Sequence, residues 1–114
     1  MRIWGHVQRI IEKKHGKLPA LQTVKKGGVG DPVTEIINDT PYKLTIWFAG
    51  KCAHETDVKP RGRIIAVFCP GSYHLAAMVD NKEYLPLVRE NQVFEGGKGY
   101  KLSIIIKQRP TVAP

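Results

Sequence analysis

Four residues in the middle of the chain carry chemistry suited to a metal site: Cys52, His54, Cys69 and His74. Cys52 and His54 are two positions apart and would share one face of a strand, while Cys69 and His74 flank a Pro-Gly turn. Thiolate and imidazole groups are ligands of zinc and copper, and four of them can close a tetrahedral site. Their spacing matches no zinc finger or zinc knuckle, so a Cys/His metal-binding module is an alternative hypothesis and not the first one.

The two cysteines have two simpler interpretations. Cys52 and Cys69 form a disulfide if their Cα atoms lie within about 7 Å, a distance that adjacent strands supply. Otherwise they are two free thiols beside exposed histidines. We favour these interpretations over metal binding and expect no resident cofactor, with zinc or copper as the alternative.

The remaining residues do not indicate a reactive site. A cysteine nucleophile needs a base and an orienting acid within hydrogen-bond reach. The nearest acids, Glu55 and Asp57, alternate along a strand as solvated edge charges commonly do. The glycine-rich segment 96–99 precedes a strand, whereas a phosphate-binding loop opens a helix. We therefore expect a protein that is not an enzyme.

The charge of the chain is concentrated near its N-terminus. The 114 residues suit one domain, and 18 Lys and Arg against 10 Asp and Glu give a formal charge of +8. Residues 1–31 hold seven basic and two acidic side chains, a net +5, which leaves +3 for residues 32–114.

The first 15 residues predict a short amphipathic helix. Their apolar side chains recur three and four positions apart, at Ile3, Trp4, Val7, Ile10 and Ile11. Gly16 is a suitable stop, because cations precede it in the last turn. Residues 17–32 are rich in Gly and Pro and are interpreted as a linker.

Seven short runs of alternating or β-branched residues follow, separated by turn residues. They cover residues 32–37, 42–49, 54–58, 63–69, 73–79, 84–89 and 100–107. No helical stretch between them could carry a parallel crossover, so the pattern predicts a mostly β, seven-stranded antiparallel sandwich. A barrel of five or six strands is the alternative. We expect residues 54–58 at a sheet edge, and residues 84–89 as well, because Pro86 cannot donate a ladder hydrogen bond.

This pattern divides the chain into a helix with a linker (1–31), a sandwich (32–109) and a tail (110–114). No apolar run approaches the roughly 18–20 residues that cross a bilayer, so no transmembrane segment is expected. No cleavable secretory signal is visible, because polar residues interrupt the apolar positions. Met1 is either a cytoplasmic start or stands where a signal has been left out, and the compartment stays open.

The turns and strand starts carry a set of short motifs: Asn38-Asp39-Thr40, Leu44-x-Ile46, Gly50, Val58-x-Pro60-x-Gly62, Cys69-Pro70-Gly71-Ser72-Tyr73 and Gly99-Tyr100-x-Leu102. Together they resemble small prealbumin-like sandwiches, such as carboxypeptidase-regulatory-like modules, over residues 33–107. The resemblance implies an Ig-like sandwich with a non-enzymatic accessory or adhesion-like role, in the cell envelope or outside the cell. It carries over no catalytic residues.

The leading functional hypothesis is a non-catalytic binding or assembly module whose partner is another protein or a second copy of the chain. The residues expected to contact the partner are Trp4, Arg9, Lys13, Lys14 and Trp47. By its parity Trp47 faces a second layer, the N-terminal helix or a ligand, and an exposed apolar face around it would support a protein partner. The alternative is an electrostatic binder of nucleic acid or of an anionic membrane surface through the +5 segment.

Overall fold

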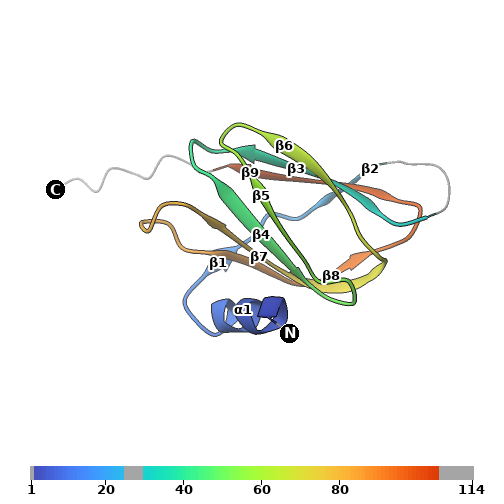
Figure 1. Ribbon diagram of the computed structural model, residues 1–114, viewed down its shortest axis with the longest axis horizontal. Coiled ribbons are helices and arrows are strands. Elements are labelled where there is room, and N and C mark those ends of the chain that lie inside the picture. The colour runs from blue at the N-terminus through green and yellow to red at the C-terminus, as the bar shows by residue number, and fades with distance from the viewer. Residues whose placement is uncertain (1, 25–29, 106–114) are drawn as a thin grey trace.

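The protein folds as one helix and two facing β-sheets in a computed structural model that describes residues 2–24 and 30–105 (Figure 1). Helix α1 (Arg2–Ile11) comes first, and the described residues then form nine strands. The five-stranded sheet, here sheet A, has the order β1 (Gly16–Lys17), β8 (Leu87–Phe94), β7 (Gly71–Val79), β4 (Leu44–Ala49), β5 (His54–Val58). The four-stranded sheet, here sheet B, has the order β2 (Gln22–Val24), β9 (Gly99–Ile105), β3 (Val33–Asp39), β6 (Arg63–Val67).

The main core fills the space between the two sheets. Alternation along β4 shows how the sequence builds it, because Leu44, Ile46 and Phe48 are fully buried while Thr45 and Trp47 lie on the other face. The same alternation in the other long strands supplies further side chains of the cluster, among them Ile36, Leu75, Leu102 and Ile104. A mostly β sandwich, as the alternation predicts, is therefore the architecture of the described chain.

Helix α1 covers the outer face of sheet A (Figure 1). Val7 and Ile10 are buried against the outward side chains of Ala49, Ala76 and Val88, which makes a second, smaller core. Burying a side chain of this size stabilises the docked helix by roughly 1.5–3 kcal/mol, which a ten-residue helix needs because it is marginal in water alone. The helix expected within the first 15 residues is therefore confirmed over Arg2–Ile11 and does not extend to Gly16.

The expected count of seven strands is wrong, because β1 and β2 lie in the segment interpreted as a linker. The Gly16 N–H donates to the Pro86 carbonyl at 2.8 Å and the Leu18 N–H donates to the Val88 carbonyl at 2.9 Å. Leu18 is buried in the main core, so the segment crosses from sheet A to sheet B as part of the sandwich. Strands of two and three residues are too short to show an alternation of apolar and polar side chains. They form because they pair with strands that are distant in the sequence. Residues 25–29 of the expected linker, the end of the last expected strand and the tail 110–114 lie outside the described residues.

The sheets are mixed and not antiparallel as expected. Strand β1 runs parallel to β8, and β3 runs parallel to β9. Parallel strands that follow each other in the chain need a crossover segment between them, and the sequence has none. In the structure the parallel partners are far apart in the chain, and the strands between them form the connection.

Two edge expectations have different outcomes. Strand β5 is an edge of sheet A, as predicted for residues 54–58. The prediction for Pro86 is wrong, since Pro86 immediately precedes β8 and β8 lies between β1 and β7. Pro86 takes part in the pairing through its carbonyl, which accepts the hydrogen bond from the Gly16 N–H.

A buried polar cluster holds the turns at one end of the sandwich. Asn38 is fully buried, and its amide Nδ2 donates to the carbonyls of Tyr42 (2.8 Å), Val58 (3.0 Å) and Lys59 (3.1 Å). Its Oδ1 accepts the Thr40 N–H at 3.1 Å and lies 2.7 Å from the Thr40 hydroxyl. One side chain therefore joins the β3–β4 turn to the end of β5 and the turn that follows it.

We predict that Asn38→Ala lowers the free energy of unfolding by about 1–3 kcal/mol, because it removes a buried amide that donates to three carbonyls and accepts from Thr40. Urea titration followed by circular dichroism measures the change. The neighbouring Asp39→Ala is the control: it removes the exposed Asp39–Arg61 ion pair (2.7 Å) and should cost less than about 1 kcal/mol. Equal effects of the two substitutions would contradict the role assigned to Asn38.

Candidate functional site

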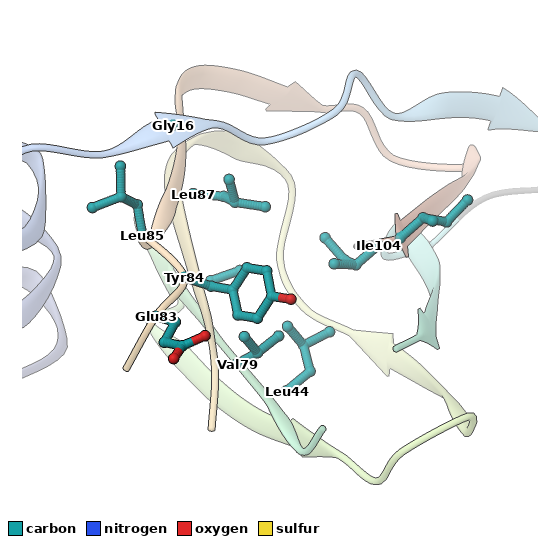
Figure 2. A pocket seen from close by; sticks show the side chains of 10 residues that line it. Gly16, Leu44, Val79, Glu83, Tyr84, Leu85, Leu87 and Ile104 are labelled. Atoms are coloured by element: carbon teal, nitrogen blue, oxygen red, sulfur yellow. The ribbon is translucent and has the colours of Figure 1, made fainter. Parts of the chain in front are cut away.

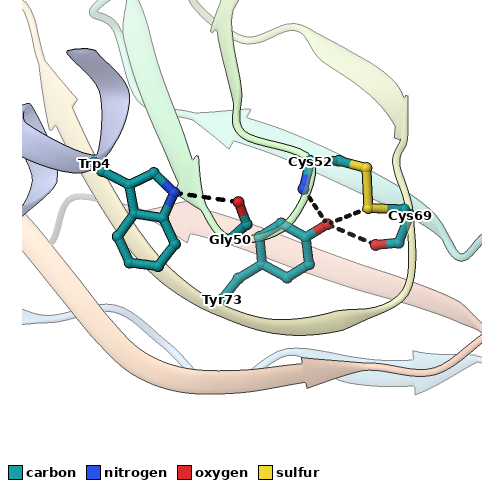
Figure 3. The surroundings of a disulfide bond; sticks show 5 residues. All are labelled: Trp4, Gly50, Cys52, Cys69 and Tyr73. Carbon is teal, nitrogen blue, oxygen red and sulfur yellow. Dashed lines mark hydrogen bonds between the residues drawn. A yellow bond between two sulfur atoms is a disulfide. The ribbon is translucent and has the colours of Figure 1, made fainter. Parts of the chain in front are cut away.

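A disulfide closes the end of the sandwich opposite the Asn38 cluster (Figure 3). Cys52 lies in the turn after β4 and Cys69 follows β6, and the two are bonded with their Cα atoms 5.7 Å apart. The bridge ties a turn of sheet A to the connection that leaves sheet B. Closing a loop of this length stabilises the fold by about 3 kcal/mol, mainly by restricting the unfolded chain.

Tyr73 fills the space beside the disulfide (Figure 3). Its hydroxyl donates to the Cys69 carbonyl at 2.6 Å and accepts the Cys52 N–H at 3.3 Å. Burial raises the pKa of this phenol above its ordinary value of 10.0. The ring lies directly against Gly50, where a Cβ atom would overlap it, so residue 50 has to be glycine. The sulfur and hydroxyl groups at this end are thus engaged in holding the structure.

The structure bonds the two cysteines to each other, and the two histidines make contacts with other residues. On β5, the His54 ring packs near Phe48 and Phe68, with centroids 5.9 and 6.4 Å away. His74 lies on the helix side of sheet A, where its ring meets Trp4 edge-on at 6.1 Å and its Nδ1 accepts the Asn91 N–H. Among the described residues, no group of three or more His, Cys, Asp or Glu gathers as metal ligands would. In this oxidised form the sulfurs are bonded to each other, so a four-ligand site would require a reduced and rearranged protein.

The two tryptophans lie at the interface between helix and sheet. Trp4 donates its indole N–H to the Gly50 carbonyl at 3.2 Å, and Trp47 packs against His6 with ring centroids 4.3 Å apart. The face around Trp47 is therefore covered by the chain's own helix, one of the arrangements that its parity allowed. Beside it is a shallow pocket of about 320 Å³ lined by Ile3, His6, Arg9, Trp47 and Glu55.

The basic side chains that the structure describes in the N-terminal segment are exposed to solvent. Arg9, Lys13, Lys14 and Lys17 are exposed around the end of the docked helix. Of the five residues expected to contact a partner, Arg9, Lys13 and Lys14 are thus accessible, Trp4 is partly so, and Trp47 serves the helix contact. Since the apolar face of the helix is used by sheet A, these cations can act on a partner only through charge.

We predict that Val7→Asp releases helix α1, because a carboxylate cannot be buried against Ala49, Ala76 and Val88 without a partner. The chain has two tryptophans and both lie at this interface, so their emission should shift to longer wavelength while the sandwich keeps its β circular dichroism. The exposed neighbour Gln8→Asp introduces the same charge on the solvent side and should leave the emission unchanged. Identical spectra for the two variants would mean that the helix is not docked in this way.

A second opening lies between the sheets at the end away from the disulfide (Figure 2). Its volume is about 410 Å³, and its walls are the aliphatic side chains of Leu44, Val79, Leu87 and Ile104, with Tyr84 at its centre. The Tyr84 ring also packs near Tyr42, with centroids 5.8 Å apart. The size and apolar walls are those of a small-molecule pocket. No sequence signal marks it, because its walls combine strand residues that are far apart in the chain with Tyr84 and Leu85 of the segment before β8.

The outer face of sheet B carries exposed apolar side chains that the sequence pattern did not indicate. Register places Val24, Gly99, Val33 and Val67 in one row across all four strands. On β6, Val67 is 56% exposed and Ile65 is 66% exposed, so no described element covers this part of the sheet. Strand β6 has apolar residues on both faces, so its sequence does not show which side chains point outward. Its position next to a turn was the sequence feature that indicated a strand end there.

Comparison with known proteins finds no family model, no curated protein and no solved structure that matches this chain. The resemblance to prealbumin-like modules therefore stays a prediction. Within the described residues, no helix is long and apolar enough to span a lipid bilayer. The geometry of the chain itself has to carry any functional argument.

Proposed function

We propose that this protein is a non-catalytic β-sandwich module that binds another protein through the outer face of sheet B. One observation carries the proposal: helix α1 packs on the outer face of sheet A over β4 and β7, whereas no described element packs over Ile65 and Val67 on the outer face of sheet B. We also propose that the sandwich is an Ig-like or prealbumin-like module, on the turn motifs that suggested this resemblance.

The chemistry of the sheet B face suits a protein partner. The row that contains Val33 and Val67 is apolar and lies at one end of this face. The next row places Ile65 beside Glu35, which also pairs with Arg63 at 3.2 Å. Protein interfaces combine apolar contacts with polar and charged groups in this way. The module has no need of a catalytic group in this role, which agrees with the structural use of Cys52, Cys69 and Tyr73.

We place this binding role in an oxidising compartment, the cell envelope or the outside of the cell. The Cys52–Cys69 disulfide supports this location, because disulfides persist in oxidising surroundings and are rare in the reducing cytosol.

We predict that Val67→Lys abolishes capture of the partner, whereas Val93→Lys does not. Val93 is the matched control, since it is 51% exposed, carries the same substitution and lies on sheet A. The three proteins are immobilised, bound proteins from the native source are identified by mass spectrometry, and each candidate is then purified and titrated by calorimetry. A loss of affinity of at least about tenfold for Val67→Lys alone is expected. Equal affinity for both variants would refute the proposed face.

The exposed cations at the end of helix α1 favour a second candidate function, the binding of a polyanion such as nucleic acid or an anionic surface. Four of them, Arg9, Lys13, Lys14 and Lys17, lie within nine residues and have few acids near them in sequence. Such binding would be electrostatic and sensitive to salt.

Heparin chromatography at two salt concentrations tests this second function. Deleting residues 1–31 is unsuitable because it would remove strands β1 and β2. We predict instead that Lys13→Gln/Lys14→Gln/Lys17→Gln elutes at lower salt than the wild type. Lys51→Gln/Lys59→Gln/Lys82→Gln loses the same charge from other exposed positions and should elute later than the first variant. Co-elution of the two triple variants would show that only net charge matters, and the second function would be rejected.

A further inference from the structure

Strand β6 is an open edge of sheet B. Among the described residues it pairs with β3 alone. The Asn38 N–H donates to the Gly62 carbonyl at 2.8 Å, which directs the backbone of residue 62 toward β3. Backbone direction alternates along a strand, so the N–H and C=O groups of Arg63, Ile65 and Val67 face the open side. The same three residues present their side chains on the uncovered face.

The other three sheet edges are protected, and β6 is not. Strands β1 and β2 are only two and three residues long, and β5 carries the exposed acids Glu55 and Asp57. Shortness and charge are the usual devices that prevent edge-to-edge pairing. Strand β6 has five residues in unbroken register with β3, no proline, and a single charge at its first position. An edge of this kind is a template for another strand.

The sequence of β6 is complementary to itself in one antiparallel register. A two-fold axis at Ile65 places this residue opposite Ile65 of the second copy, and Arg63 opposite Val67 of the second copy. The two arginines are then four positions apart, roughly 14 Å, which exceeds the screening length of about 8 Å at physiological salt. Each arginine also keeps its own Glu35 partner at 3.2 Å. A register centred on Arg63 would instead bring like charges face to face.

We propose that the partner of this face is a second copy of the chain, joined through an antiparallel β6–β6 pair centred on Ile65. This inference rests on the proposed function and names its partner. About six backbone hydrogen bonds close between the two edges, and the two four-stranded sheets become one continuous sheet of eight. On the outer face of this sheet the two Ile65 side chains become lateral neighbours, and each Val67 lies beside Arg63 of the second copy.

The effect of salt on the association distinguishes a second copy from an acidic partner strand. Each chain carries +8, so two copies repel each other at long range and salt should strengthen their association. An acidic strand docking beside Arg63 would be attracted, and salt would weaken it. Sedimentation velocity of the full chain over a range of concentrations, at low and high salt, therefore distinguishes the two occupants.

We predict a reversible dimer that is more populated at high salt. Ile65→Lys places two ammonium groups across the axis and should raise the dimer dissociation constant at least about tenfold. Ile105→Lys is the matched control, because Ile105 is 60% exposed on β9 of the same sheet, away from the β6 edge, and its variant should dimerise like the wild type. A monomer at all concentrations, a dimer weakened by salt, or equal behaviour of the two variants would overturn the proposal.

A cysteine at the axis tests the register directly. The described residues contain no free cysteine, and directly opposed Cα atoms in a hydrogen-bonded antiparallel pair lie about 5.5 Å apart, within disulfide reach. Ile65→Cys should therefore cross-link into a dimer under mild oxidation, and Ile105→Cys should not. Failure of Ile65→Cys to cross-link would remove this register. If the chain does not dimerise but Val67→Lys still loses a captured protein, the second copy is refuted while the proposed binding function stands.

Discussion

Each strand of a two-sheet sandwich has two faces, and only one of them can enter the shared core. Strand β4 illustrates the constraint, because Leu44, Ile46 and Phe48 fill the core and thereby turn Trp47 and Ala49 outward. On sheet A, the N-terminal helix covers these outward residues. On sheet B, nothing among the described residues does the same for Ile65 and Val67. The difference between the two outer faces follows from one helix serving two sheets.

The sequence predicts the parts of this fold that depend on local periodicity. Alternation locates the long strands, and the spacing of Val7 and Ile10 locates the helix and its buried side. The strand at 84–89 is displaced toward Phe94, because Tyr84 and Leu85 precede the strand and line the pocket between the sheets. What local periodicity cannot give is pairing between distant segments. Strands β1 and β2 and both parallel pairs arise from contacts whose partners are about 65 or more residues away.

The candidate sites follow the same division. The spacing of Cys52 and Cys69 left a bridge, free thiols or a metal site open, and only the geometry of the β4–β5 turn against the β6–β7 connection joins the two sulfurs. The outward direction of the Ile65 and Val67 side chains could not be predicted, because β6 has apolar residues on both faces. Asn38 was visible as a turn residue, but its three carbonyl partners come from two turns that the fold alone brings together.

The position of β9 bears on how the chain reaches its structure during synthesis. Strands β2 and β3 lie on either side of β9, the last strand of the described residues, so sheet B cannot close until β9 has left the ribosome. Strand β1 likewise waits for β8. Folding from the N-terminus onward would leave the edges of β3 and β6 open together, a state that favours pairing with neighbouring nascent chains. Topology thus makes the sandwich a late, cooperative event in which the first and last strands fold together.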